Sequence, residues 1–313
     1  MTGGAQAERR FACFGECMVE LRSAGPGLFH QSFAGDSCNT AIYLSRLRPT
    51  GWRVDYVSAV GGDPFAAAMR QAWRDEGLAD DLVREVPGRS TGLYAIHVDE
   101  RGERRFSYWR DTSAARAYFD VPATPLENAL AHIDALYLSG ISVAILDPSA
   151  RDRLLGVVQR LKERGALIAW DNNYRSRLWD GPKLARATMD RFCALADVAL
   201  LSMEDALAMH ESNDAQVLLE ALHRLPCAEV VVKRGGQPAL VRTIGAPFVD
   251  VPVQAVARPV DTTAAGDAFN AAYLAARLRG QSASEAAAAG NRLAATVVMH
   301  PGAIIPRDAM PLL

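Results

Sequence analysis

The sequence predicts an α/β protein in which helices cover both faces of a mainly parallel sheet. From residue 125 onward, short apolar runs alternate with helical segments, and repeated strand–helix–strand crossovers of this kind build parallel sheets. Half of the 313 residues are hydrophobic, which is enough for a large core. The sequence has no internal repeat, low-complexity tract or linker, so we expect one domain over residues 1–313.

The first part of the chain begins with an apolar run and then alternates between extended and helical segments. Proline is favoured in the first turn of a helix, so Pro64 after Gly61-Gly62-Asp63 predicts a helix start. The expected elements are a buried strand over 11–19, an extended segment over 28–34, a helix over 35–48, a strand over 53–60 and a helix over 64–76.

A hairpin then interrupts the alternation. Residues 93–98 and 104–108 read as strands, and the glycine-containing segment 99–103 between them reads as their loop. A hairpin at this point suggests a small β-strand lid added to the main sheet. We expect the lid to comprise roughly residues 20–34 and 88–116.

The alternation resumes after Pro125 and continues to the last long helix. Gly235-Gly236 predicts a tight turn, and Gly280 stands where the end of a helix favours glycine. The expected strands cover 135–138, 167–170, 198–201, 229–232, 239–241 and 247–251, and the expected helices cover 148–164, 183–195, 214–225 and 265–279.

The segment over residues 260–269 is the strongest candidate for chemistry. Asp267 is expected in the first turn of the helix over 265–279, beside unpaired backbone N–H groups that form an anion site. Small residues there let a phosphate approach the backbone, and a carboxylate within reach of it can accept the proton of an attacking hydroxyl. The structural alternative is that Asp261 or Thr262 simply caps a buried helix.

Composition excludes several classes of partner and compartment. The net charge of −2 gives no electrostatic case for binding nucleic acid or an acidic membrane. The cysteines are odd in number and scattered, which indicates reduced thiols rather than a disulfide framework or a zinc site. The first ten residues lack the apolar stretch of a signal peptide, so we expect a cytoplasmic protein.

The segment Asp261-Thr262-Thr263-Ala264-Ala265-Gly266-Asp267 resembles the C-terminal signature of the ribokinase-like (PfkB) sugar kinases, D-T-x-G-A-G-D. Ala264 stands where many members have glycine, and the Ala-Ala-Gly-Asp form is familiar among the 2-keto-3-deoxygluconate kinases. The substitution is harmless if Ala264 has an ordinary negative φ. The resemblance implies the three-layer α/β/α ribokinase-like fold, with Asp267 as the catalytic base.

Two further segments resemble the substrate side of these kinases. Gly35-Asp36-Ser37-Cys38-Asn39 resembles the motif that grips sugar hydroxyls, and residues 106–115 resemble the lid segment that holds an acid sugar. The structural alternatives are a helix cap with an exposed asparagine, and a solvated hairpin. The resemblance implies that the substrate contacts Gly35, Asp36, Asn39, Tyr94, Tyr108, Arg110, Arg175 and Asp267.

Polar residues that follow the predicted strands resemble the nucleotide side of the family. Asp205 in Ser202-Met203-Glu204-Asp205 suggests a weak, indirect role in binding magnesium, and no residue is predicted as a direct metal ligand. The structural alternatives are solvated helix-start carboxylates and an arginine tied into a turn. The resemblance implies that ATP contacts Asn173, Arg175, Ser202, Lys233, Gly235, Ala264, Ala265, Gly266 and Asn291.

The implied reaction is the ATP- and Mg²⁺-dependent phosphorylation of 2-keto-3-deoxygluconate at its 6-hydroxyl, by a homo-oligomer. The alternatives are a kinase for a neutral sugar, such as a fructokinase or ribokinase, and a non-catalytic sugar-acid sensor on the same fold. Because Asp267 is expected at a helix N-terminus, we also expect a lowered pKa, which would make it a weak base.

Overall fold

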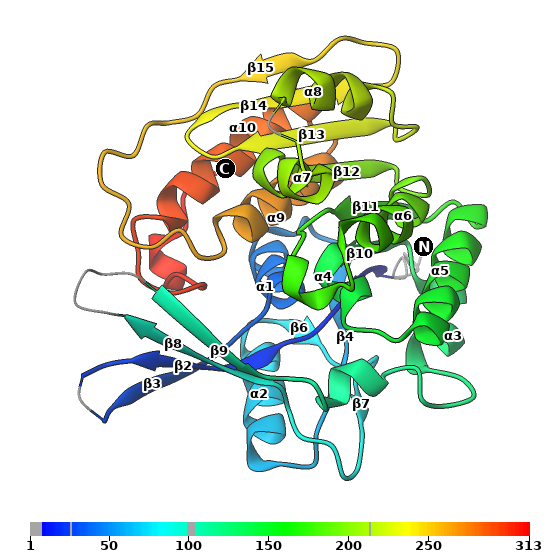
Figure 1. The fold of residues 1–313 in the computed structure, drawn as a ribbon, viewed down its shortest axis with the longest axis vertical. Helices are drawn as coiled ribbons and strands as arrows, with labels where there is room; N and C mark the ends of the chain where they lie inside the picture. Colours follow the sequence, from blue (N-terminus) through cyan, green and yellow to red (C-terminus); the bar gives the residue numbers. More distant parts are fainter. Residues whose placement is uncertain (1–7, 26, 99–103, 213) are drawn as a thin grey trace, which may run out of the picture.

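The structure is a computed structural model that describes residues 8–25, 27–98, 104–212 and 214–313, and it has the three layers predicted from the sequence (Figure 1). The strand order of the main sheet is β15-β14-β13-β12-β11-β10-β1-β4-β6. The pairings from β6 to β13 are parallel, whereas β14 and β15 are added antiparallel.

The strands of the main sheet are short, and most are buried on both faces. They are β1 (Arg9–Phe14), β4 (Trp52–Val57), β6 (Leu78–Ala79), β10 (Ala135–Ser139), β11 (Leu167–Asp171), β12 (Val198–Ser202), β13 (Glu229–Arg234), β14 (Gln237–Thr243) and β15 (Val249–Val251). A separate parallel pair is formed by β5 (Ala59–Val60) and β7 (Arg84–Glu85).

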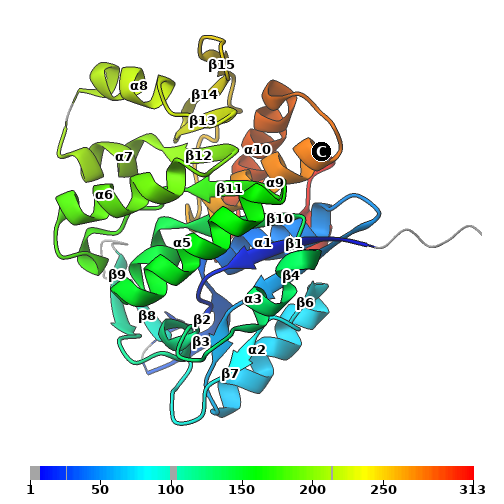
Figure 2. The ribbon, with the colours of Figure 1, turned by 90° about the vertical axis from the view of Figure 1, so that its right-hand side faces the viewer.

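Helices cover both faces of this sheet (Figure 2). One face packs against α3 (Pro125–Ala129), α4 (Gly140–Ala144), α5 (Pro148–Glu163), α6 (Pro182–Cys193), α7 (Met203–His210) and α8 (Ala215–His223). The other face packs against α1 (Asp36–Leu47), α2 (Pro64–Asp75), α9 (Ala265–Leu278) and α10 (Ala283–Val297).

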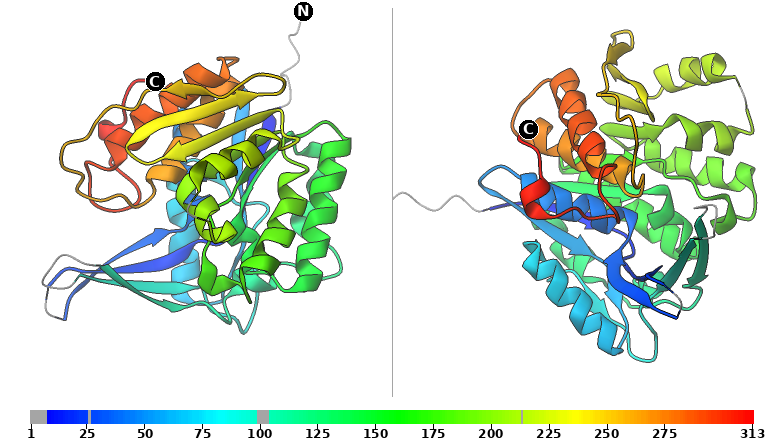
Figure 3. Two further views of the ribbon diagram at one scale, coloured as in Figure 1. Left: turned by 45° about the horizontal axis from the view of Figure 1, so that its top comes forward. Right: turned by 90° about the vertical axis from the view of Figure 1, so that its left-hand side faces the viewer.

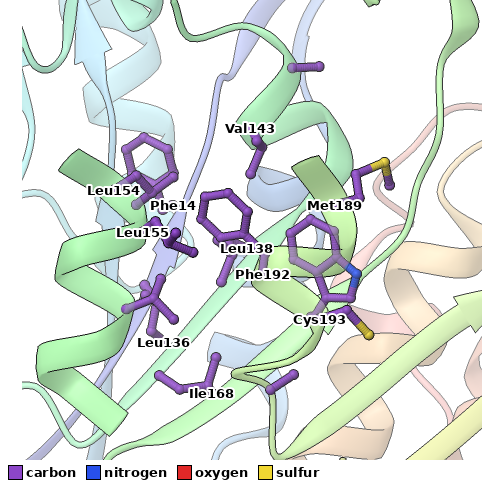
Figure 4. Packing of buried hydrophobic residues seen from close by; sticks show 14 of the residues in the cluster. Phe14, Leu136, Leu138, Val143, Leu154, Leu155, Ile168, Met189, Phe192 and Cys193 are labelled. Atoms are coloured by element: carbon purple, nitrogen blue, oxygen red, sulfur yellow. The ribbon is translucent and has the colours of Figure 1, made fainter. Parts of the chain in front are cut away.

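Successive residues of the central strands alternate between the two cores, as the pleat of a β-strand requires. Leu136, Leu138 and Ile168 belong to the core on the α5 and α6 side, where Figure 4 shows them packed against side chains of those helices. Tyr137, between Leu136 and Leu138, and Ala169, which follows Ile168, belong to the core on the α1 and α9 side. Both faces are therefore apolar, which explains why these strands read as continuous hydrophobic runs.

A second sheet with the order β3-β2-β8-β9 extends from the main body (Figure 3). Its strands come from the two segments predicted to form a lid, and we refer to it as the lid. Its strands are β2 (Met18–Ser23), β3 (Phe29–Ala34), β8 (Leu93–Val98) and β9 (Arg104–Trp109). The predicted hairpin is confirmed, since β8 and β9 pair antiparallel, while its loop over 99–103 lies outside the described residues. The two predicted lid segments meet through the parallel pairing of β2 with β8.

The prediction of one strand over residues 11–19 is wrong. β1 ends at Phe14, and after residues 15–17 the chain enters β2 of the lid. At Gly15 the backbone approaches helix α1 so closely that a Cβ would lie 2.1 Å from the Ser37 Oγ. Only glycine fits there, so the chain leaves β1 at a position where its backbone packs directly against Ser37.

Helices α3, α4, α7 and α10 were not predicted, although the sequence carries clear signals for α7 and α10. α10 begins with a capping box formed by Ser282 and Glu285 and continues through an alanine-rich run. α7 begins at an N-cap, where the Ser202 hydroxyl accepts a hydrogen bond from the Asp205 N–H. In the described part of the chain no helix is long and apolar enough to cross a membrane. The five cysteines are buried free thiols.

Candidate active site

Neighbouring parallel strands end at one edge of the main sheet, and polar residues gather there. Ser139 at the end of β10 is in register with Asp171 at the end of β11, and Ser202 of β12 is in register with Lys233 of β13. Glu16 follows β1 at the same edge. Crevices beyond the carboxyl ends of parallel strands are where open α/β sheets bind ligands.

The N-termini of α1 and α9 meet at this edge. The Asn39 side chain of α1 donates a hydrogen bond to the Asp267 carboxylate (2.9 Å), which joins the two segments that the sequence singled out. Asp36 accepts hydrogen bonds from the Ser139 hydroxyl (2.5 Å) and from the Asn173 amide (2.8 Å). Gly35 must be glycine, because a Cβ would lie 2.1 Å from the Glu16 carbonyl oxygen.

The expectation of a lowered pKa for Asp267 is wrong, because its pKa is raised to about 7. Burial is the main cause, since it disfavours the charged carboxylate, and the negative charge of Asp36 adds to it. The Asn39 hydrogen bond opposes the shift but does not overcome it. Burial also raises the pKa of Asp36. Burial thus favours the protonated form of both acids at the helix starts.

Helix α9 has no side-chain cap, so the reading of Asp261 or Thr262 as its N-cap is also wrong. The N-cap is Ala264, which has the left-handed conformation with φ of 60°. Asp261 instead accepts hydrogen bonds from the backbone N–H groups of Thr263 (2.8 Å) and Gly302 (3.0 Å). Alanine in place of glycine at position 264 was expected to be harmless only with a negative φ. Because φ is positive, Ala264 carries backbone strain.

A buried polar network lies beside the start of α9. The Lys233 ammonium donates to the Asn270 carbonyl oxygen (2.9 Å) and lies 3.4 Å from the Asp171 carboxylate. The Asn270 amide in turn donates to Asp171 (2.8 Å) and to the Tyr137 hydroxyl (3.2 Å). A Cβ at Gly266 would lie 3.6 Å from the Lys233 ammonium, so this cation lies beside the predicted anion site.

The lid tyrosines occupy one face of their sheet. Tyr94 and Tyr108 are directly opposite each other on β8 and β9, and their rings stack with centroids 5.7 Å apart. The Tyr94 hydroxyl bonds to the Glu20 carboxylate of β2. Burial, followed by the charge of Glu20, raises the pKa of Tyr94, so this phenol stays protonated and can donate.

Arg110, expected to hold the substrate carboxylate, already has a carboxylate partner from the protein. Its Nη2 donates to Glu16, 94 positions earlier in the chain, and both side chains are almost fully buried. The Arg110 Nε and the Glu16 Oε1 are buried without a hydrogen-bond partner within the described residues. The charges of this buried pair largely cancel.

Arg175 and Asp205 form a half-exposed ion pair with an N–O distance of 3.3 Å. Burial raises the pKa of Asp205 to about 6, and Arg175 opposes that shift. The Asn173 side chain is directed to Asp36 of α1, and the Ser202 hydroxyl caps α7. The expected contacts of Asn173 and Ser202 with ATP therefore stay predictions.

Gly235 and Asn291, which were also expected to contact ATP, lie in a turn and on a helix. Gly235 has φ of 60° in the turn between β13 and β14. The buried Asn291 amide donates to the backbone oxygens of Val251 (3.2 Å) and Pro252 (2.9 Å). A cavity of about 230 Å³ lies one turn farther along α10, lined by residues 254–258, Ala295, Thr296 and Met299.

Several residues of this site were not predicted. Asn270 lies three positions after Asp267, so the helical spacing that placed Asp267 could also have placed Asn270 on the same face. Asp171 lies only two positions before Asn173 and four before Arg175, which were both predicted. Glu16 and Glu20 are carboxylates inside apolar segments, an unusual position that indicates a buried partner.

Comparison with known proteins shows the family to which the chain belongs. The family model described as pfkB family carbohydrate kinase matches residues 8–310, and the chain belongs to this family. It is 41% identical to the 2-dehydro-3-deoxygluconokinase of Dickeya dadantii over 97% of this chain and 99% of that protein. The identity to the Escherichia coli K12 2-dehydro-3-deoxygluconokinase is 39%, with the same coverage.

The chain is also similar, at lower identity, to a fructokinase and to a solved fructokinase structure. A Klebsiella pneumoniae fructokinase is 30% identical over 83% of this chain and 82% of its own length. Fructokinase from Xylella fastidiosa with bound ATP superposes with a TM-score of 0.79 at 22% identity, covering 97% of this chain and 95% of that one. This likeness confirms the ribokinase-like α/β/α fold predicted from the sequence.

Proposed function

We infer that the chain is an ATP-dependent kinase that phosphorylates 2-keto-3-deoxygluconate at its 6-hydroxyl, giving 2-keto-3-deoxy-6-phosphogluconate. The observation that carries this inference is the hydrogen bond between Asn39 and Asp267, which joins the sugar-binding loop to the carboxylate at the phosphate-binding helix start. Similarity over nearly the full chain to 2-dehydro-3-deoxygluconokinases supports this substrate over fructose, because the fructokinases are more distant.

Asp267 orients the 6-hydroxyl and accepts its proton. Its pKa of about 7 suits a general base near neutral pH, since the carboxylate is then partly ionised and basic enough to take a proton. The backbone N–H groups over 264–267 and the Lys233 ammonium stabilise the negative charge on the transferred phosphoryl group. Positioning and electrostatic stabilisation supply most of the catalysis in phosphoryl transfer.

ATP extends from the start of α9 toward α10. The segment that leads into α9 lies against the C-terminal end of α10, because the N–H groups of Val260 and Asp261 donate hydrogen bonds to the Val298 carbonyl. The cavity of about 230 Å³ beside Ala295 and Thr296 would hold the base of the nucleotide. At the phosphate end of ATP, away from the base, Arg175 contacts a phosphate group.

Magnesium fits this site through phosphates and water rather than through a protein cage. Within the described residues no group of three or more His, Cys, Asp or Glu side chains could hold a metal ion, and Mg²⁺ at kinase sites is bound mainly by substrate phosphates. Asp205, which is largely ionised at neutral pH, would contact it through water. When bound, the ion supplies positive charge that bridges the ATP phosphates.

The acid sugar lies between α1 and the lid. Gly35, Asp36 and Asn39 hold its hydroxyls, while Tyr94, Tyr108 and Arg110 contact it from the lid. The homo-oligomeric state and the cytoplasmic location expected from the sequence stay predictions.

A screen of ATP consumption tests the proposal. Purified protein is offered 2-keto-3-deoxygluconate, fructose and ribose in parallel, with Mg²⁺ and ATP. We expect the highest kcat/KM for 2-keto-3-deoxygluconate. Higher efficiency with fructose or ribose would favour the neutral-sugar alternative. Binding of the acid sugar with no ATP consumption would favour the sensor.

A further inference from the structure

The cations that the sequence assigned to the site are each paired with a protein carboxylate. Lys233 lies beside Asp171, Arg110 bonds to Glu16, and Arg175 pairs with Asp205. Opposite charges at these short distances largely cancel, so an entering sugar carboxylate would gain little net attraction from these three pairs.

Arg177 is different. It lies in the short 3₁₀ helix η3 (Ser176–Leu178), two residues after Arg175, and it is exposed. The carbon of its guanidinium lies 3.5 Å from the centre of the Tyr108 ring. Across residues 8–25, 27–98, 104–212 and 214–313, its guanidinium has no ion pair or hydrogen bond.

Stacking on an aromatic ring leaves the hydrogen-bonding capacity of arginine intact. The attraction is between the positive charge and the ring face, whereas the five N–H donors point outward in the plane of the guanidinium. A planar cation held in this way can bind a carboxylate with two parallel hydrogen bonds. Arg177 is therefore a positioned cation with its donors still available.

The ring beneath Arg177 belongs to the substrate face of the lid. Tyr108 stacks on Tyr94, whose hydroxyl bonds to Glu20. Arg177 itself belongs to the segment between β11 and α6, in the main body of the protein. The contact between Arg177 and Tyr108 thus links the main body to the lid directly beside the expected sugar position.

We propose that Arg177 pairs with the carboxylate of the acid sugar and that Tyr108 holds its guanidinium in place for this contact. This inference rests on the proposed function, because only an acid substrate needs the extra cation. Arg110 then contributes a hydrogen-bond donor from a neutralised pair, and Arg177 supplies the uncompensated positive charge that distinguishes an acid sugar from a neutral one.

Steady-state kinetics of Arg177→Gln test this role, with the full chain and with 2-keto-3-deoxygluconate and ATP as substrates. A lost hydrogen-bonded charge contact is worth about 1.5–3 kcal/mol, so we expect the KM for the acid sugar to rise about 10- to 100-fold. The kcat and the KM for ATP should stay within about threefold, and Arg177→Lys should recover part of the loss.

Arg191→Gln is the matched control, since Arg191 is an exposed arginine on α6 that pairs with Asp152 at 3.0 Å. It changes the net charge equally, and its KM should match the wild type. An unchanged KM in Arg177→Gln, with an active wild type, would overturn the role of Arg177 alone. A wild type that does not phosphorylate the acid sugar would overturn the proposed function and this inference together.

Discussion

Asp267 owes its chemistry to its surroundings more than to its position on a helix. A helix N-terminus favours a charged carboxylate, but burial beside Asp36 raises the pKa of Asp267 to about 7. The sequence could place Asp267 at the helix start because the motif is local. It could not supply the burial or the proximity of Asp36, which lies 231 positions earlier and approaches only through the packing of α1 on α9.

The pH dependence of the reaction should report this pKa. The base must be ionised, so kcat/KM should fall about tenfold per pH unit below about pH 7. Asn39→Ala removes a hydrogen bond that lowers the pKa of Asp267, so the acidic limb should move to higher pH. Initial rates at low substrate concentration between pH 5 and 9 measure both. A limb near pH 4 in the wild type would be incompatible with a raised pKa.

Asp267→Asn should lose activity and gain stability. Removal of a general base lowers kcat by roughly 10²–10⁴. The folded-state pKa lies above the ordinary carboxyl value, so ionisation costs the wild type stability as the pH rises from about 4 to 7, and the full cost persists above pH 7. Asparagine removes this cost, so the variant's Tm advantage should be larger at pH 8 than at pH 5.

Thermal unfolding at the two pH values, together with single-turnover rates, checks both parts of the Asp267→Asn prediction. Asp250→Asn is a suitable control, because Asp250 is an exposed carboxylate that pairs with Arg234 on the surface. An unchanged kcat in a folded Asp267→Asn variant would remove the assignment of the base.

At the scale of elements, the start of α9 combines an anion site with backbone strain. A non-glycine residue in the left-handed region costs about 1–2 kcal/mol, and Ala264 has φ of 60°. The strain persists because α9 packs between the sheet, α1 and α10. The sequence identified the substituted position but not its φ, which the tertiary packing fixes.

Ala264→Gly should stabilise the protein by about 0.5–1 kcal/mol, because the strain removed exceeds the added flexibility of the unfolded chain. Urea unfolding measures this change. Ala288→Gly on α10 is the control with the same substitution at an ordinary helical position, where it should destabilise by about 1 kcal/mol. If both variants lose stability equally, Ala264 carries no strain.

The lid shows where local sequence patterns stop being informative. The hairpin of β8 and β9 was predicted because its two strands are close in sequence, and Tyr94 lies directly opposite Tyr108 in it. The pairing of Arg110 with Glu16 was not predicted, because these residues are 94 positions apart and neither segment indicates the other. Local signals predict elements, whereas buried ion pairs depend on the topology that joins distant elements.

At the scale of the whole molecule, the parallel sheet explains why distant motifs form one site. The carboxyl ends of β10 to β13 meet at one edge, and the starts of α1 and α9 converge on it. Most elements could be predicted from hydrophobic runs and helix signals. The break between β1 and β2 near Gly15 was not predicted, and the close approach of Gly15 to Ser37 beside it becomes visible only in the folded chain.

The most direct test of the central claim is to identify the product formed from 2-keto-3-deoxygluconate and ATP. Phosphorus NMR of the reaction mixture, with carbon–phosphorus couplings, locates the transferred phosphate. The account predicts a single phosphomonoester on the 6-oxygen, formed in equal amount to ADP and roughly 10²–10⁴ times more slowly with Asp267→Asn. ADP released together with free phosphate, or a phosphate on another oxygen, would contradict the claim that Asp267 directs the 6-hydroxyl to the phosphoryl group at the start of α9.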